Sequence, residues 1–346
     1  MTSKSGAGER PSVHVFSLGG TIASTTGADV RTGVSPTLGA TDLLAGLPGP
    51  CGDEVDVTAT SVRQTASSDL TWDDLVTLAR LVDQAFADGV SGVVITQGTS
   101  TIEETAFALE LLVASSRPVV VTGAMRNPTL AGADGRANLA AALRVAACPS
   151  ACDIGALVVF NDEVHAARFV RKSHTSSPSA FASAMVGPIG YLTEGRVGIL
   201  VRPPRAGPLA HRLDKPVPAV ALVTMAFGDD GRLLDALPAR GYAGVVIEGF
   251  GAGHVPARTV ATVQRLVEQV PVVLASRTGA GEVLERTYSF AGGEIDLLGR
   301  GLLRAGPLDG PKSRILLSLC LAVHDDRARA QERFAAVVEQ LRRQSA

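Results

Sequence analysis

The sequence predicts an α/β fold, with a larger N-terminal domain built on a parallel sheet and a smaller C-terminal α/β domain. The chain has 346 residues, 46% of them hydrophobic, and chains longer than about 250–300 residues usually divide into domains. Short apolar runs rich in β-branched residues alternate with longer stretches of helical periodicity. This alternation is typical of βαβ units, whose parallel strands are covered on both faces.

Short apolar runs mark the expected strands. They are Val13–Leu18, Gly92–Thr96, Pro118–Thr122 and Ala156–Phe160, then Ala219–Met225, Gly244–Glu248 and Val270–Ala275. The stretches between them carry apolar residues at helical spacing. The expected helices are Trp72–Ala87, Ile102–Ala114, Gly135–Ala147 and Pro256–Gln269, with a charged C-terminal helix within Asp325–Arg343.

A proline-rich stretch separates the two halves of the chain. Prolines recur from Pro203 to Pro218 without a long apolar run between them, and such clusters mark loops and linkers. We therefore expect an N-terminal catalytic domain over residues 1–205, a linker over 206–217 and a C-terminal α/β domain over 218–346.

Charge and cysteine content disfavour several classes of function. The 32 Lys+Arg residues nearly balance the 34 Asp+Glu residues, so the chain has no cationic excess with which to bind nucleic acid. Its four cysteines are too few for a disulfide framework, and no cluster of His, Cys or Asp has metal-ligand spacing. We expect no nucleic-acid partner, no metal and no cofactor.

Membrane insertion and export are also disfavoured. Gly, Pro or charge interrupts every apolar run, so none approaches the roughly 20 residues that a membrane span needs. The polar segment Met1–Arg10 and the short apolar run after it do not form a signal peptide. The expectation is a cytoplasmic protein without a membrane partner.

Two loops that follow predicted strands carry candidate chemistry, because ligands of parallel sheets bind beyond the carboxyl ends of strands. One strand runs into Gly19-Gly-Thr21 and another into Gly98-Thr99. Either loop alone is more typical of a turn followed by a helix cap, and Thr101 has capping-box spacing to Glu104. A hydroxyl acts as a nucleophile only near a base and an oxyanion donor. Sequence spacing does not bring a base to either threonine.

The segments Gly19-Gly-Thr-Ile-Ala23 and Gly98-Thr-Ser-Thr-Ile-Glu-Glu-Thr105 together resemble the two signature motifs of the bacterial-type L-asparaginases and glutaminases. Further segments agree with that family in order and spacing over nearly the whole chain. They are Val121–Arg126 with Ala133–Leu139, Asn161–Arg168 with Lys172, Ser276–Gly281 and Lys312–Leu317. The resemblance implies an amidohydrolase that converts a side-chain carboxamide to a carboxylate and ammonia.

The resemblance also implies a mechanism. In the family, the hydroxyl at the position of Thr21 attacks the carboxamide carbon, ammonia leaves, and water hydrolyses the acyl-enzyme. Thr99 matches the second catalytic threonine, and Lys172 matches a lysine that assists proton transfer. Such a lysine needs a lowered pKa, which burial or a nearby cation provides. The cationic residues within Arg168–His174 would lower it if they approach. Which threonine attacks first stays open.

Substrate contacts follow from the same resemblance. Ser67 matches a serine that binds the substrate α-carboxylate, Ser68 matches the next binding position, and Glu282 matches an acidic residue that in some members reaches the neighbouring subunit's site. A solvated loop glutamate is an equal alternative for Glu282. The candidate substrate-binding residues are Gly20, Ser67, Ser68, Gly98, Ser100 and Glu282. We expect a homodimer or homotetramer that acts on a small-molecule amide.

The second motif departs from the family pattern. Ordinary members read His-Gly-Thr-Asp-Thr, whereas this chain has Gln97-Gly-Thr-Ser-Thr101. The family's aspartate pairs with the substrate α-ammonium and borders the lysine, so Ser100 leaves Lys172 without that counter-ion. A charge-assisted hydrogen bond contributes about 1.5–3 kcal/mol, or roughly 10- to 150-fold in recognition of a free amino acid.

The loop that follows the first motif, which forms a lid over the site in the family, also differs from the family pattern. The family carries a tyrosine there, but the segment Ile22–Pro36 contains none, and Gly33 or a neighbour stands in its place. In the C-terminal half, Ala252 and His254 replace amide residues that are common near the intersubunit site.

Three functions remain open. The first is an amide hydrolase that uses Thr21 or Thr99 and acts either poorly on L-asparagine or on a carboxamide or lactam without a free α-ammonium. The second is a conventional L-asparaginase in which Ser100, water and Glu282 supply the missing contacts. The third alternative is a non-catalytic ligand-binding homologue. An archaeal-type amidotransferase component is disfavoured, because the chain lacks the basic excess that transfer-RNA binding needs.

Overall fold

The computed structural model describes residues 10–26, 34–36, 38–45, 54–209 and 213–343. These residues form two compact units, each described by itself. The first unit takes its residues from Met1–Leu109, Ser115–Ser183 and Gly187–Arg202, and the second from Glu110–Ala114, Ala184–Val186 and Pro203–Ala346. The domain boundaries expected at 205/206 and 217/218 stay a prediction.

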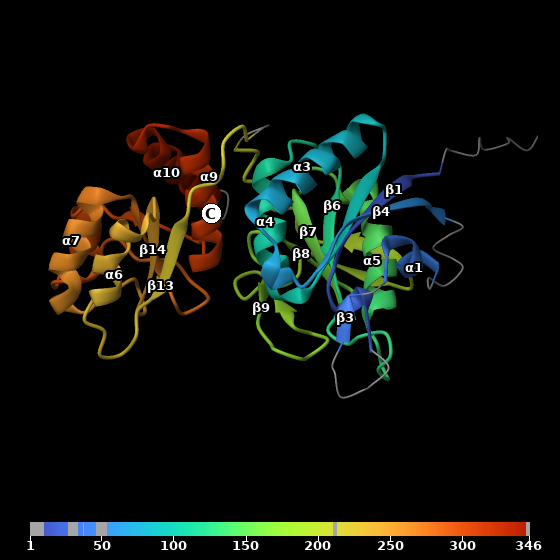
Figure 1. Cartoon of the computed structure of the whole chain (residues 1–346), viewed down its shortest axis with the longest axis horizontal. Helices are drawn as coiled ribbons and strands as arrows, with labels where there is room; N and C mark the ends of the chain where they lie inside the picture. The colour runs from blue at the N-terminus through green and yellow to red at the C-terminus, as the bar shows by residue number, and fades with distance from the viewer. Residues whose placement is uncertain (1–9, 27–33, 37, 46–53, 210–212, 344–346) are drawn as a thin grey trace, which may run out of the picture. The chain divides into compact units, whose positions relative to one another are not determined.

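An eight-stranded mixed sheet lies at the centre of the first unit (Figure 1). Its parallel strands are, in spatial order, β4 (Asp56–Thr65), β1 (Ser12–Gly19), β5 (Gly92–Thr96), β6 (Val119–Thr122) and β7 (Ala156–Phe160). Every residue of β5, β6 and β7 is buried, which is why these strands appear in the sequence as continuous apolar runs. The α/β class and the parallel arrangement of these strands are confirmed.

Antiparallel strands complete one edge of this sheet. They are β8 (Glu163–Ala166), β11 (Gly190–Thr193) and β12 (Arg196–Ile199). None of them was predicted from the sequence, and neither was the edge strand β4. In β4, β11 and β12 many residues are exposed or half-buried, so polar residues interrupt the apolar run that marks a strand. The sheet is therefore mixed rather than parallel throughout.

Helices cover both faces of the sheet. Figure 1 shows α3 (Trp72–Ala87) and α4 (Ile102–Leu112) on one side, and α1 (Ala40–Ala45) and α5 (Gly135–Ala146) on the other. On the α5 side, Leu143 belongs to one core cluster with Val15 of β1 and Val94 of β5. Helix α3 begins where predicted, because Thr71 and Asp74 form a reciprocal capping box at its first turn.

The second unit has a four-stranded parallel sheet in the order β13 (Val220–Thr224), β14 (Gly244–Gly249), β15 (Val272–Ser276) and β16 (Leu303–Arg304). Its helices are α6 (Arg232–Ala236), α7 (Val260–Gln269), α8 (Glu294–Gly299), α9 (Gly310–Val323) and α10 (Arg327–Arg343). Leu234, Val263 and Leu297, from α6, α7 and α8, pack in one core cluster with the sheet. The smaller α/β unit predicted for the C-terminal half is confirmed.

Two small hairpins project from the first unit. Strand β2 (Ser24–Thr26) pairs with β3 (Val34–Pro36), and β9 (Arg171–Lys172) pairs with β10 (Phe181–Ala182). The first hairpin contains part of the lid expected over Ile22–Pro36. Gly33, the position predicted to replace the lid tyrosine, lies outside the described residues, as do Cys51 and residues 1–9.

Two kinds of feature are absent from the described ranges. No helix in them is long and apolar enough to cross a membrane. Likewise, no three of their His, Cys, Asp or Glu residues are grouped in a way that could hold a metal ion.

Candidate active site

Three short 3-10 turns follow neighbouring parallel strands: η1 (Thr21–Ala23) after β1, η4 (Thr99–Thr101) after β5 and η3 (Ser67–Asp69) after β4. The first residue of each turn is a predicted site residue. Since the carboxyl ends of adjacent parallel strands meet at one edge of a sheet, the turns lie together there. The topology thus gathers two threonines and a serine that are far apart in sequence.

Buried glycines let these turns touch. A Cβ on Gly20 would lie 2.0 Å from the backbone N of Gly98, and a Cβ on Gly98 would lie 2.8 Å from Oγ of Ser67. Gly20 has a φ of 81°, a conformation that glycine adopts without steric cost. Gly20 and Gly98, both predicted site residues, are therefore the contact points through which the three loops pack.

Hydrogen bonds of polar side chains connect the second motif to the turn η3, which contains Ser67. The Thr101 hydroxyl donates to the backbone O of Ser67 at 3.1 Å and accepts from Nε2 of Gln97 at 3.2 Å. Gln97 is fully buried. Thr101 therefore links two loops, a contact that its capping-box spacing to Glu104 does not reveal.

Lys172 reaches the second threonine. It lies in β9, and its Nζ donates to Oγ1 of Thr99 at 2.8 Å across 73 residues of sequence. Thr99 is 6% exposed and Lys172 is half-buried, so bulk water competes little for this hydrogen bond. The structure thus brings together two of the three predicted catalytic residues by direct contact, and Thr21 through the contact between the motif loops.

The environment of Lys172 makes its amine easier to deprotonate than that of an exposed lysine. Burial lowers the pKa of Lys172 below its ordinary value, and the carboxylate of Glu103 opposes this by raising it. The cations of Arg168–His174 were expected to lower this pKa, but burial is the cause of the shift. His174 is exposed, and its Nδ1 accepts from the backbone N of Ser176 and Ser177.

Glu103 is a site residue that the sequence did not nominate. It lies in the first turn of α4, and its Oε2 accepts from the backbone N of Lys172 at 2.5 Å. Ser100 was expected to leave Lys172 without a counter-ion, but a carboxylate acts on Lys172 from Glu103 instead. The sequence placed Glu103 in a helix's first turn, whereas its partner lies 69 residues away.

Hydroxyl groups of the site differ in exposure. Ser67 is 4% exposed, Thr21 is half-buried, and Ser68 and Ser100 are exposed. Ser68 and Ser100 are therefore open to a ligand, whereas Ser67 is enclosed by the neighbouring loops.

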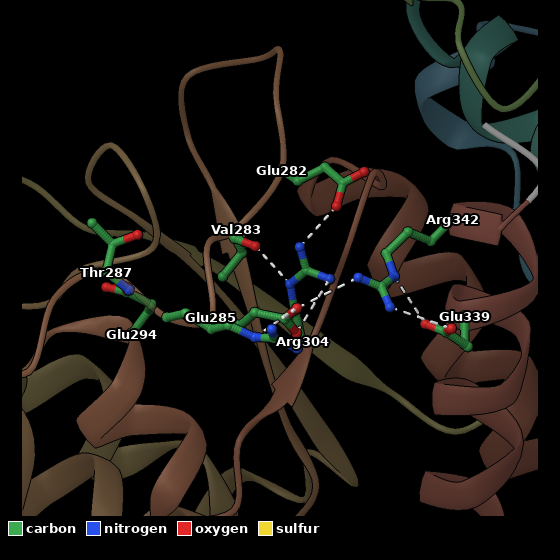
Figure 2. A network of polar contacts seen from close by, with 9 residues as sticks. Glu282, Val283, Glu285, Thr287, Glu294, Arg304, Glu339 and Arg342 are labelled. Atoms are coloured by element: carbon green, nitrogen blue, oxygen red, sulfur yellow. Dashed lines mark hydrogen bonds and ion pairs between the residues drawn. The ribbon is translucent and has the colours of Figure 1, made fainter. Parts of the chain in front are cut away.

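Glu282 belongs to the second unit and to a network of charges there. Figure 2 shows Arg304 of β16 between Glu282 and Val283. Its Nη2 donates to Oε2 of Glu282 at 2.8 Å, and its Nε donates to the backbone O of Val283 at 2.6 Å. Glu285 forms ion pairs with both Arg304 and Arg342 of α10. Its Oε2 lies 3.8 Å from Nη1 of Arg304, and its Oε1 lies 3.4 Å from Nη1 of Arg342. Glu282 is thus ion-paired within its own unit rather than a solvated loop side chain.

His254 is packed into the same unit. Its Nε2 lies 3.2 Å from Oε2 of Glu294. Its ring packs edge-on against the rings of Tyr288 and Phe290, with distances between ring centroids of 4.9 Å and 5.0 Å. Glu294 is fully buried and accepts from the backbone N of Thr287 and Tyr288. These contacts give His254 a structural role in holding the loop that follows Glu282.

The fold and this site together are typical of one class of protein, α/β enzymes whose polar residues gather beyond the carboxyl ends of parallel strands. Residues 12–205 match the family described as "Asparaginase, N-terminal", and residues 219–334 match the "Glutaminase/Asparaginase C-terminal domain". The chain belongs to this family of amidohydrolases.

Individual relatives agree with the family assignment. An L-asparaginase of Bacillus licheniformis is 32% identical over 317 residues, covering 91% of this chain and 96% of the relative. A glutaminase-asparaginase of Pseudomonas aeruginosa is 33% identical over 331 residues, covering 93% of this chain and 89% of that protein. The crystal structure of a probable cytoplasmic L-asparaginase from Campylobacter jejuni superposes with a TM-score of 0.85, at 30% identity, over 94% of this chain and 99% of that one.

Proposed function

We propose that this protein hydrolyses the side-chain carboxamide of an asparagine-like substrate to a carboxylate and ammonia. Thr21, Thr99 and Lys172 are the proposed catalytic residues. The observation that carries the proposal is the 2.8 Å hydrogen bond between Lys172 Nζ and Thr99 Oγ1 at the edge of the sheet where Thr21 also lies. A lysine with a lowered pKa beside a hydroxyl is the arrangement that proton transfer needs.

The proposed chemistry has two steps. The Thr21 oxygen attacks the carboxamide carbon, its proton passes toward the Thr99–Lys172 pair, and the amide nitrogen takes a proton and leaves as ammonia. Water then attacks the acyl-enzyme ester, the pair accepts a proton from it, and the Thr21 hydroxyl is restored. The N-terminal backbone N–H groups of the turns η1 and η4 are the available donors for the oxyanion.

The proposed substrate is an amide that carries a carboxylate and depends little on an α-ammonium group. Ser67 and Ser68 are the proposed carboxylate-binding hydroxyls, with Gly20 and Gly98 shaping the pocket. Ser100 offers an exposed, neutral hydroxyl where ordinary family members have an aspartate. A succinamate-type monoamide therefore fits better than a free amino acid. L-asparagine stays the alternative, with Ser100, water and Glu282 supplying the missing contacts.

The proposed setting is a cytoplasmic homodimer or homotetramer without a cofactor, a nucleic-acid partner or a membrane partner. Glu282 motivates the oligomer, because in some family members the matching acid serves a neighbouring subunit's site. Light scattering on the purified chain tests this part. A fully active monomer would contradict it.

Trapping the acyl-enzyme tests the proposed mechanism. Protein quenched in acid during turnover is digested, and the peptides are analysed by mass spectrometry. An acyl group on the peptide that contains Thr21 is expected. An acyl group on Thr99 would reverse the order of the two threonines. A ligand that raises the melting temperature without turnover would identify a non-catalytic binding protein.

A further inference from the structure

One turn of helix holds Lys172 at two points. Thr99 and Glu103 are four residues apart, at the start of η4 and in the first turn of α4, so they lie on the same side of that turn. Thr99 accepts from the amine of Lys172, and Glu103 accepts from its backbone N. Both ends of the lysine are therefore hydrogen-bonded to the contiguous segment formed by η4 and α4.

The strand that carries Lys172 needs such a support. Strand β9 has only two residues, and its pairing with β10 joins Lys172 to Phe181 and Arg171 to Ala182. The residues that follow, from Ser173 to Ser176, are exposed. Without the bond from Glu103, this short hairpin alone would position an amine that has to meet Thr99 within hydrogen-bond distance.

Charge gives Glu103 a second effect. Its carboxylate is the charged group whose field raises the pKa of Lys172 against the lowering by burial. Glu103 is the charged group that acts on the pKa of Lys172, whereas Glu104 follows Glu103 in α4, and Arg171 and His174 flank Lys172 in sequence. The neighbouring hydroxyl of Ser100 supplies no charge.

We propose that Glu103 is the positioning residue of the site, which holds the Lys172 backbone and supplies the counter-charge that Ser100 lacks. The inference rests on the proposed role of Lys172 in proton transfer. Two variants separate the two effects of Glu103. Glu103→Gln keeps an oxygen for the Lys172 N–H but removes the charge, whereas Glu103→Ala removes both.

The pH profile of kcat/KM tests this proposal. Lys172 must be neutral to accept a proton, so activity rises with pH through its pKa. Removal of the Glu103 charge lowers that pKa, and the rising limb of Glu103→Gln should move to lower pH by about 1 unit. Adding Ser100→Asp to Glu103→Gln restores a carboxylate near Lys172, so the rising limb of kcat/KM should return to higher pH. Glu103→Ala should show the same shift of the limb and, in addition, lose about 100-fold in kcat on the plateau above the limb, because an amine displaced by about 1 Å loses its alignment.

Matched controls complete the experiment. Glu104→Gln, one residue further along the same helix, should leave the limb where it is, and circular dichroism should show that each variant is folded. A limb that stays in place in folded Glu103→Gln would overturn the proposal. Full activity in Lys172→Met would instead refute the proposed function of the lysine, so the two failures are distinguishable.

Discussion

In the proposed mechanism, proton transfer depends on Lys172. An exposed lysine is protonated at neutral pH, but this one donates to Thr99 from a half-buried position, and burial lowers its pKa. We expect kcat/KM to rise with pH and to level off below 10.5, the ordinary lysine value.

Replacement of this lysine should be costly. Lys172→Met keeps the length of the side chain but removes the base, and we expect kcat to fall by about 10²–10⁴-fold. Lys215→Met, which removes only an exposed ion pair with Asp325, should retain wild-type activity. Steady-state ammonia release measures both variants, and comparable losses in the two would contradict the assignment.

In the proposed site, the residue at position 100 determines whether a substrate with an α-ammonium is preferred. Ser100→Asp restores a carboxylate at an exposed position, and we expect the preference for L-asparagine over succinamate to rise by roughly 10- to 150-fold. The ratio of the two kcat/KM values measures it. An unchanged ratio would show that another group recognises the amino acid.

At the scale of elements, the site depends on close packing of short turns beyond β1, β4 and β5. Gly20→Ala would force a methyl group to within 2.0 Å of the Gly98 N, which pushes the two motif loops apart. A displacement of about 1 Å costs about 100-fold in rate, so we expect loss of activity together with a lower melting temperature.

A second glycine provides the control for that variant. Gly89 has a φ of 100°, but nothing lies within 4 Å of its added Cβ. Gly89→Ala should therefore lose about 1–3 kcal/mol of stability from backbone strain and keep its activity. Equal activity losses at Gly20 and Gly89 would show that strain, rather than the contact between loops, explains the effect.

The loop before α8 depends on one buried carboxylate. Burial alone would raise the pKa of Glu294, but the backbone N–H groups of Tyr288 and Thr287 outweigh it and lower this pKa. Its contribution to stability is therefore present above the ordinary value of 4.5 and is lost as pH falls through the lowered value.

Thermal unfolding of Glu294→Gln measures this contribution. Near pH 7 the variant should melt below the wild type, because a neutral amide oxygen forms hydrogen bonds to the N–H groups of Thr287 and Tyr288 that are weaker, by about 1 kcal/mol, than those of a carboxylate. The difference should shrink as pH falls below 4.5. Glu332→Gln, on the exposed surface of α10, should match the wild type at every pH. A difference for Glu294→Gln that is constant with pH would contradict this explanation.

At the scale of the whole molecule, burial decides which elements the sequence predicts. Gly92–Thr96 and Ala156–Phe160 are predicted with their observed bounds, because every residue of these strands is buried. Trp72–Ala87 is also predicted correctly, since its apolar residues repeat at helical spacing behind a capping box. Strands such as Asp56–Thr65, whose residues are exposed or half-buried, leave no apolar run for the sequence to show.

For the site too, the sequence predicts the features that depend on local pattern and misses those that depend on contacts between distant residues. Thr21 and Thr99 follow strands directly, so the rule for parallel sheets locates them. The contacts of Lys172 with Thr99 and Glu103 join residues that are 73 and 69 positions apart. No local pattern encodes such pairs, because the crossovers of the sheet bring them together. The resemblance to a family nominated Lys172, but it did not nominate Glu103.

Ammonia release tests the central claim most directly. Purified wild-type protein and Thr21→Ala are incubated with L-asparagine, D-asparagine, L-glutamine and succinamate at several pH values. We predict that the wild type releases ammonia, with succinamate a better substrate than L-asparagine, and that Thr21→Ala releases none. Absence of ammonia from every amide with the wild type, or full activity in Thr21→Ala, would contradict the proposed function.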